Sequence, residues 1–132
     1  MDVKKHPERR VLHIISIPFI YAAAIPVVIL DIFTEIYHRV CFPLYNISYI
    51  KRSKYIKIDR PKLSYLNPFD KVNCMYCGYV NGFAAYFVAI CGATEKYWCG
   101  IKHEGYKDLH MPEHHKEFLE YGDKKEYKNM SK

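Results

Sequence analysis

The segment from residue 11 to residue 30, VLHIISIPFIYAAAIPVVIL, contains no Asp, Glu, Lys or Arg. At 1.5 Å per residue a helix of this length is about 30 Å long, which matches the hydrocarbon thickness of a bilayer. Basic residues precede the segment at Lys4, Lys5, Arg9 and Arg10, and such a flank favours a cytoplasmic N-terminus, but the flank after the segment is basic too, so charge alone does not settle the topology. The segment therefore predicts a membrane helix.

The same residues leave open how the helix meets the membrane. A cleavable signal peptide is not expected, because the small residues 22–24 are followed by more apolar sequence up to Leu30. Pro18 and Pro26 each remove a backbone hydrogen bond, so we expect a kinked helix that either spans the bilayer or dips into one leaflet. A buried helix of a soluble domain is the plainer alternative.

The net charge is +6, and the cations gather between residues 38 and 62. Because this cluster directly follows the apolar segment, we expect it to contact anionic lipid head groups, where each charge contributes about 1 kcal/mol. Nucleic acid phosphates attract the same cations, but nucleic acid binding is not expected, since it leaves the apolar neighbour unexplained. The cluster contains Arg39, Lys51, Arg52, Lys54, Lys57, Arg60 and Lys62, with Asp59 as the acid among them.

Changes in composition divide the chain into segments. The expected fold is mainly α: a Pro-kinked N-terminal membrane helix, spanning or dipping, followed by a small zinc-stapled helical hairpin. The segments are a basic lead (1–10), a helix that is apolar and then amphipathic (11–43), a basic connector with one short strand in KYIKID (44–72), a metal-binding hairpin (73–104) and a polar tail with helical character after Pro112 (105–132).

The cysteines predict a metal site. Two of them lie in NCMYCGYVNG, and TEKYWCGIKH adds a cysteine and a histidine at helical spacing, which gives C-x2-C-x21-C-x3-H. Three cysteines and one histidine form a closed tetrahedral set for structural zinc, with iron less favoured. Four protein ligands leave no position for water, so no catalytic residue is predicted. The predicted ligands are Cys74, Cys77, Cys99 and His103.

This zinc site requires the chain to reverse. In one straight helix Cys99 would lie about 33 Å from Cys77, too far to share an ion. Gly92 can end one helix and Thr94 can begin the next, so the zinc hypothesis predicts a hairpin with its turn near Gly92. Buried small hydrophobes or a redox pair are the alternatives for these thiols. Cys91 is expected in the core.

Two weaker groups also contain acid–base or metal-ligating side chains. Asp31, Glu35 and His38 share one helical stripe at the membrane boundary, which is best interpreted as a polar face turned to water or to the basic cluster. The tail offers a second metal site, although a solvated helix is favoured there. The tail residues concerned are His110, Glu113, His114 and His115.

The blocks NCMYCGYVNG and TEKYWCGIKH, preceded by DRPKLSYLN, resemble an uncharacterised family of small bacterial membrane-associated proteins that keeps NCxYCxYxNG and TExYWCxIKH together. The resemblance covers the run from Asp59 to His103 closely. It implies a bacterial source and the ligand set Cys74, Cys77, Cys99 and His103, and it implies no activity. Where the family reads CPIKH, this chain has Gly100, which loosens the helix without removing a ligand.

Taken together, these features predict a membrane-anchored zinc protein that serves as an interaction, accessory or assembly subunit of a membrane complex. An enzyme is less favoured than a binding role, and no small-molecule substrate is indicated. The alternatives are a thiol-based redox or metal sensor at the membrane surface and a small interfacial enzyme acting on lipid. Reduced thiols favour the cytoplasmic side of a bacterial inner membrane for the metal domain.

Overall fold

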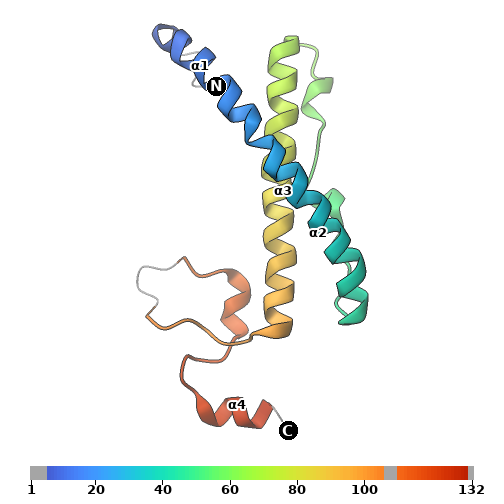
Figure 1. Cartoon of the computed structure of the whole chain (residues 1–132), viewed down its shortest axis with the longest axis vertical. Helices are drawn as coiled ribbons and strands as arrows, with labels where there is room; N and C mark the ends of the chain where they lie inside the picture. Colours follow the sequence, from blue (N-terminus) through green and yellow to red (C-terminus); the bar gives the residue numbers. More distant parts are fainter. Residues whose placement is uncertain (1–5, 106–109, 131–132) are drawn as a thin grey trace.

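The computed structural model describes residues 6–105 and 110–130, and within these ranges the chain is helical without a named β-strand. The prediction of a mainly helical chain that begins with a long apolar helix is confirmed (Figure 1). The elements are η2 (Pro7–Arg9), α1 (Arg10–Ala22), α2 (Ala24–Leu44), η3 (Arg52–Lys54), η4 (Arg60–Lys62), α3 (Pro68–Trp98), η6 (Glu113–Glu117) and α4 (Lys124–Met130).

The apolar segment forms two consecutive helices, α1 and α2, that meet at Ala23. Pro26 has no N–H to donate to the carbonyl one turn before it, so the helical hydrogen bonding is interrupted at this point. Pro18 lies inside α1. The second helix passes through Pro43 and ends at Leu44, one residue later than predicted.

The third long helix, α3, is uninterrupted over 31 residues. Its start follows capping rules: the Asn67 side chain accepts a hydrogen bond from the Asp70 N–H at 2.8 Å, and Pro68 takes the first helical position. The helix continues through Gly92 to Trp98 and stops at Cys99, whose backbone is extended. The hairpin predicted for residues 73–104, with its turn near Gly92, is therefore wrong.

Local contacts explain why the helix does not end at Gly92. A Cβ added to Gly92 would lie 2.9 Å from Cε1 of the His114 ring, so the glycine here allows close packing rather than a left-handed turn. The Thr94 hydroxyl donates to the Ile90 carbonyl one turn back, at 2.9 Å, and does not cap a new helix. Both contacts are compatible with a continuous helix.

The two long apolar helices, α1–α2 and α3, run in the same direction and cross each other (Figure 1). Side-chain hydrogen bonds join them along their length, and the residue numbers rise together on both helices. The bonded pairs are Ile20–Tyr76 and Tyr21–Asn73 near the start of α3, then Asp31–Tyr79, Glu35–Tyr86, His38–Tyr86 and Tyr37–Thr94 further along.

Because the helices are parallel, the connector (residues 45–67) has to return along them, and it does so as an extended segment beside both (Figure 1). Two glycines of α3 let it approach closely. A Cβ at Gly82 would lie 2.8 Å from the Tyr55 carbonyl oxygen, and one at Gly78 would lie 3.0 Å from that of Lys57. The short strand predicted in KYIKID does not form: among the described residues this stretch has no strand partner.

The core is small and lies between α2, α3 and the connector. Its buried members are Phe42, Phe83, Tyr86 and Ile90, and connector side chains pack against them. The remaining hydrophobic side chains of α1 and α2 are largely exposed, so most of the apolar surface of this chain is not used to build the core.

Candidate functional site

The four predicted zinc ligands do not lie together. Cys74 and Cys77 are in the first part of α3, whereas Cys99 follows its last residue, so the rise of the helix separates Cys77 from Cys99 by about 33 Å. One ion cannot bind all four residues in this arrangement, and zinc at this set stays a prediction that requires α3 to break. Cys91, expected in the core, is instead exposed.

The structure brings a different group of ligand-type side chains together at the end of α3. Glu95 of α3 and two adjacent histidines of η6 place one ligand atom each within 4.8 Å of one another. Nε2 of His114 is 2.8 Å from Oε2 of Glu95, and Nε2 of His115 is 3.0 Å from Oε1. The carboxylate thus bridges two imidazoles. We call Glu95, His114 and His115 the Glu–His–His cluster.

The cluster is held in place by the fold of residues 110–123, which we call the C-terminal segment. Lys102 N–H donates to the Leu119 carbonyl at 2.9 Å, and Leu119 N–H donates to the Gly100 carbonyl at 2.7 Å. Phe118 is buried and stacks on the His115 ring with 4.7 Å between centroids. A further ion pair joins Lys96 of α3 to Glu117. These contacts fold the segment back onto the end of α3.

The sequence suggested the tail histidines as a metal site, but with other partners. His114 and His115 belong to the cluster, whereas His110 and Glu113 do not. His103, predicted as a zinc ligand with the cysteines, lies close by: its ring centroid is 6.0 Å from that of His115. The acid that completes the cluster, Glu95, comes from the part of α3 that was expected to be the second arm of a hairpin.

An apolar groove of about 490 Å³ between α2 and α3 reaches this cluster, because Glu95 is one of its lining residues. Most of its other lining residues are aliphatic or aromatic, which suits a nonpolar occupant. Cys91 opens onto it. The remaining lining residues are Leu30, Phe33, Thr34, Tyr37, Phe87, Ile90, Thr94 and Trp98.

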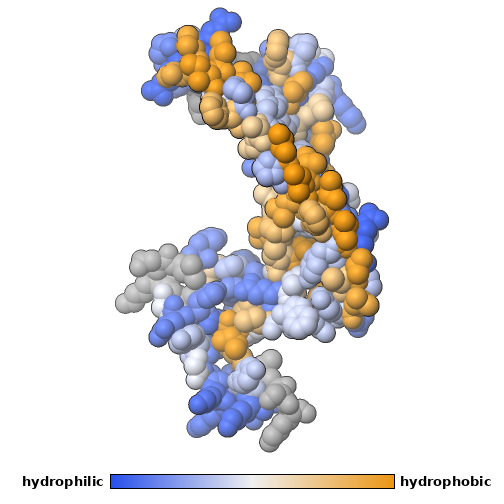
Figure 2. Space-filling model, in the orientation of Figure 1, coloured by the Kyte–Doolittle hydropathy of each residue, from blue (hydrophilic) through white to orange (hydrophobic). Residues whose placement is uncertain are grey.

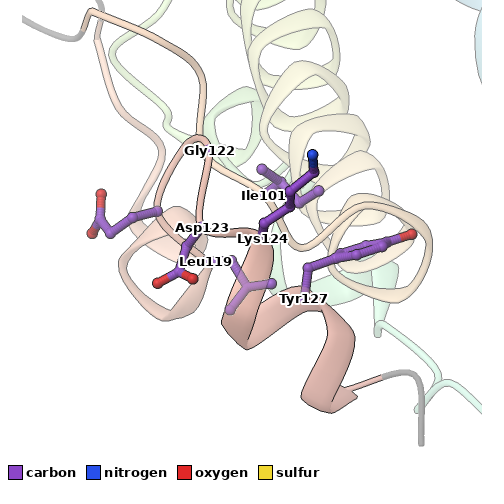
Figure 3. Close-up of a pocket in the computed structure, with 7 residues that line it drawn as sticks. Ile101, Leu119, Gly122, Asp123, Lys124 and Tyr127 are labelled. Atoms are coloured by element: carbon purple, nitrogen blue, oxygen red, sulfur yellow. The ribbon is translucent and has the colours of Figure 1, made fainter.

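A second hollow of about 410 Å³ lies beyond the cluster, between the Ile101–Leu119 bridge and α4 (Figure 3). Ile101 and Leu119 come from the two bridged segments, and Tyr127 comes from α4. Gly122 and Asp123, just before α4, and Lys124, its first residue, complete the labelled lining. The hollow therefore separates the docked C-terminal segment from the last helix.

The Asp31, Glu35 and His38 stripe of α2 does not face water. Asp31 and His38 are buried, and the two acids of the stripe bind Arg52 of the connector. The guanidinium makes two hydrogen bonds to the Asp31 carboxylate, both 2.5 Å, and a third to Glu35 at 3.2 Å. The Asp31 hydrogen bonds raise the pKa of Arg52 above its already high value, so it stays charged. The sequence predicted that the stripe faces either water or the basic cluster, and the contact with Arg52 agrees with the second of these.

Tyrosines of α3 complete the stripe's hydrogen bonding. The Ile50 N–H donates to Nε2 of His38 at 3.2 Å, so the His38 proton is on Nδ1 and is donated to the Tyr86 hydroxyl at 2.9 Å. Tyr86 in turn donates to Glu35 at 2.9 Å, and Tyr79 donates to Asp31. Every member of this network has a partner, which indicates a structural tie between α2, α3 and the connector rather than a reactive centre.

Much of the apolar surface of α1, α2 and α3 is not covered by other described parts of the chain. The most apolar window of the Pro7–Leu44 helical stretch has none of its residues buried, and Pro68–Trp98 is also long and apolar enough to cross a membrane. Figure 2 shows this hydrophobic surface along α1, α2 and the middle of α3, with a hydrophilic C-terminal part below it. Phe19 and Phe33 are 74% and 66% exposed. A surface of this extent is typical of proteins that bind lipid or another protein.

No family model, curated protein or solved structure matches this chain.

Proposed function

We propose that this protein is an interfacial membrane protein that acts as an accessory or assembly subunit. Its α1 and α2 lie along the membrane surface with their apolar side chains in one leaflet, and its C-terminal segment extends toward water. The observation that supports this most strongly is the unburied apolar surface of α1 and α2. In water such a surface would drive aggregation.

The parallel arrangement of the helices favours an in-plane position over a double crossing. If α1–α2 and α3 both crossed the bilayer in the same direction, the connector would have to cross it as well. The connector is largely non-helical and contains Lys51, Lys54 and Lys57. Exposed irregular backbone and unpaired cations are strongly disfavoured in hydrocarbon.

The charge of the connector fits the same position. In an in-plane protein its lysines reach the head groups while the neighbouring helices insert apolar side chains. The expected location is the cytoplasmic face of a bacterial inner membrane, where anionic lipids are present and thiols stay reduced. All five cysteines of the chain are free. A partner membrane protein would then contact the hydrophilic C-terminal part.

Vesicle binding tests the role of the apolar surface. We expect Phe19→Ser and Phe33→Ser each to weaken partitioning into phosphatidylglycerol-containing vesicles by about tenfold or more, because each removes a large apolar side chain from the leaflet. Cosedimentation of the full chain measures this. Tyr121→Ser is the matched control: Tyr121 is 57% exposed but belongs to the C-terminal segment, so its loss leaves binding unchanged. Equal effects at all three positions would contradict the proposal.

Head-group charge gives a separate prediction. Lys54→Glu with Lys57→Glu is expected to lower binding to phosphatidylglycerol vesicles at low salt and to leave binding to pure phosphatidylcholine vesicles unchanged. Screening by salt removes the difference between wild type and variant. An equal loss on both lipids would show that the substitutions act on the fold and not on head-group contact.

Sidedness distinguishes an in-plane helix from a crossing one. In a chain whose five cysteines are serine, single cysteines are introduced as Arg9→Cys and Lys54→Cys and labelled in inner-membrane vesicles with a membrane-impermeant maleimide. An in-plane α1–α2 exposes both positions on the same side. Labelling of the two positions from opposite sides would establish a crossing and overturn the in-plane proposal.

A further inference from the structure

We infer that Glu95, His114 and His115 bind one divalent transition-metal ion of the zinc class, and that this ion fastens the C-terminal segment to the end of α3. The site differs from the cysteine-based one predicted by the sequence. It is independent of membrane binding, so either proposal can fail alone.

The geometry of the donors is the first support. Three ligand atoms from two distant parts of the chain lie within 4.8 Å of one another. Two of the contacts, 2.8 and 3.0 Å, are between imidazole nitrogens and different oxygens of the same carboxylate. Small movements of the side chains would therefore let one ion replace the shared protons. Two imidazoles and a carboxylate suit zinc and its neighbours rather than calcium or magnesium, which prefer oxygen ligands.

The second support is an incomplete hydrogen-bond arrangement around His115. Its side chain is only 4% exposed, and its Nδ1 is buried with no hydrogen-bond partner among the described residues. Buried ring nitrogens are nearly always paired, since an unpaired one costs about 1–3 kcal/mol. The hydrogen bond to Glu95 uses Nε2 and satisfies only one of the two ring nitrogens, so the pairing of this buried ring is incomplete in the metal-free arrangement.

The third support is the packing of His114 against α3. Its ring occupies the space where Gly92 lacks a side chain: a Cβ there would be 2.9 Å from Cε1 and 3.0 Å from Nδ1. Gly92 thus allows the imidazole to approach the helix one turn from Glu95. A histidine placed this closely has little rotational freedom, which favours a preformed site over a loose surface cluster.

The coordination shell has room for a fourth ligand. Three protein ligands leave one tetrahedral position open, and His103 lies near enough to fill it after a side-chain rotation, with its ring 6.0 Å from that of His115. In that case one residue of the sequence-predicted set takes part, without the cysteines. Otherwise water occupies the position.

Metal titration of the full chain in detergent tests the site. After removal of metal by a chelator, we expect Co²⁺ to bind in one equivalent and to give tetrahedral d–d absorption without a thiolate charge-transfer band, and Zn²⁺ to displace it. Glu95→Gln keeps the size of the side chain, and we expect it to weaken zinc binding at least 100-fold; His115→Ala should do the same. The triple variant Cys74→Ser, Cys77→Ser and Cys99→Ser should bind as wild type does.

A structural readout accompanies the titration. Zinc at 100 times its Kd should slow tryptic cleavage at Lys116 by about 100-fold where cleavage requires the segment to open. Glu95→Gln should abolish this protection even if the variant folds normally. Absence of stoichiometric binding, a cobalt spectrum with thiolate bands, or loss of binding only in the cysteine variant would overturn the inference.

Discussion

Replacing Arg52 with leucine is expected to lower the free energy of unfolding by about 3 kcal/mol. The substitution leaves the buried Asp31 carboxylate with one tyrosine donor and removes a donor from Glu35. An uncompensated buried charge costs about 3–5 kcal/mol, and we expect the lower end because a third of the Arg52 side chain reaches solvent. Urea unfolding of the full chain in micelles, followed by near-UV circular dichroism, measures the change.

The control for this variant is Lys54→Leu, on the same 3-10 turn (η3). Lys54 is exposed, so its replacement should change stability by less than about 0.5 kcal/mol. Adding Asp31→Asn to Arg52→Leu removes the unpaired charge and should recover part of the loss. If both leucine variants unfold alike, or if Asp31→Asn lowers the stability of Arg52→Leu further, the Arg52 network does not hold the connector.

The parts of the fold that depend on local sequence could be predicted. The uncharged run from residue 11 to residue 30 determines an apolar helix. A kink was expected at both Pro18 and Pro26; the helix is interrupted at Ala23, just before Pro26, whereas Pro18 lies inside α1. Asn67 and Pro68 likewise mark the start of α3. These signals act within one turn of helix.

The hairpin prediction failed because it placed a turn near Gly92 only in order to bring Cys99 and His103 to the distant Cys74 and Cys77. Gly92 and Thr94 suit a helix end, but both also occur inside helices when a neighbour needs the space or a hydroxyl can bond one turn back. Here His114 supplies the neighbour, and it comes from a segment whose position the sequence does not specify. The pairing of Glu95 with the tail histidines was missed for the same reason.

Some long-range features left a signal in the sequence. Gly78 and Gly82 are four residues apart on one face of α3, a small-x3-small spacing that allows another segment to pack closely. Tyr76, Tyr79 and Tyr86 share that helix and donate hydrogen bonds to α1 or α2. The glycine and tyrosine positions thus indicate which side of α3 is in contact with other segments. They do not indicate that Arg52 is the residue that the polar stripe binds.

The closest approach of the connector to α3 gives the second large effect. We expect Gly82→Val to lower the free energy of unfolding by about 2–3 kcal/mol, because a Cβ at this position would lie 2.8 Å from the Tyr55 carbonyl oxygen and 2.9 Å from Cα of Ile56. Both are backbone atoms, so the connector has to move. Urea unfolding under the conditions used for Arg52→Leu provides the measurement.

Helix propensity alone would make the replacement of Gly82 stabilising, so it opposes the steric effect and allows the two to be distinguished. Glycine inside a helix is less favourable than alanine by about 0.8–1.0 kcal/mol, so Gly82→Ala would be stabilising if the connector were not packed here. We expect a net destabilisation instead, because the steric term is larger. Ala85→Val, on an exposed position of the same helix, tests valine without the clash and should lower stability by no more than about 0.7 kcal/mol, the helix-propensity difference alone. A stabilising Gly82→Ala would mean that the connector is not held against α3. The connector's lysines would then not be fixed beside the apolar helices, as the in-plane proposal requires.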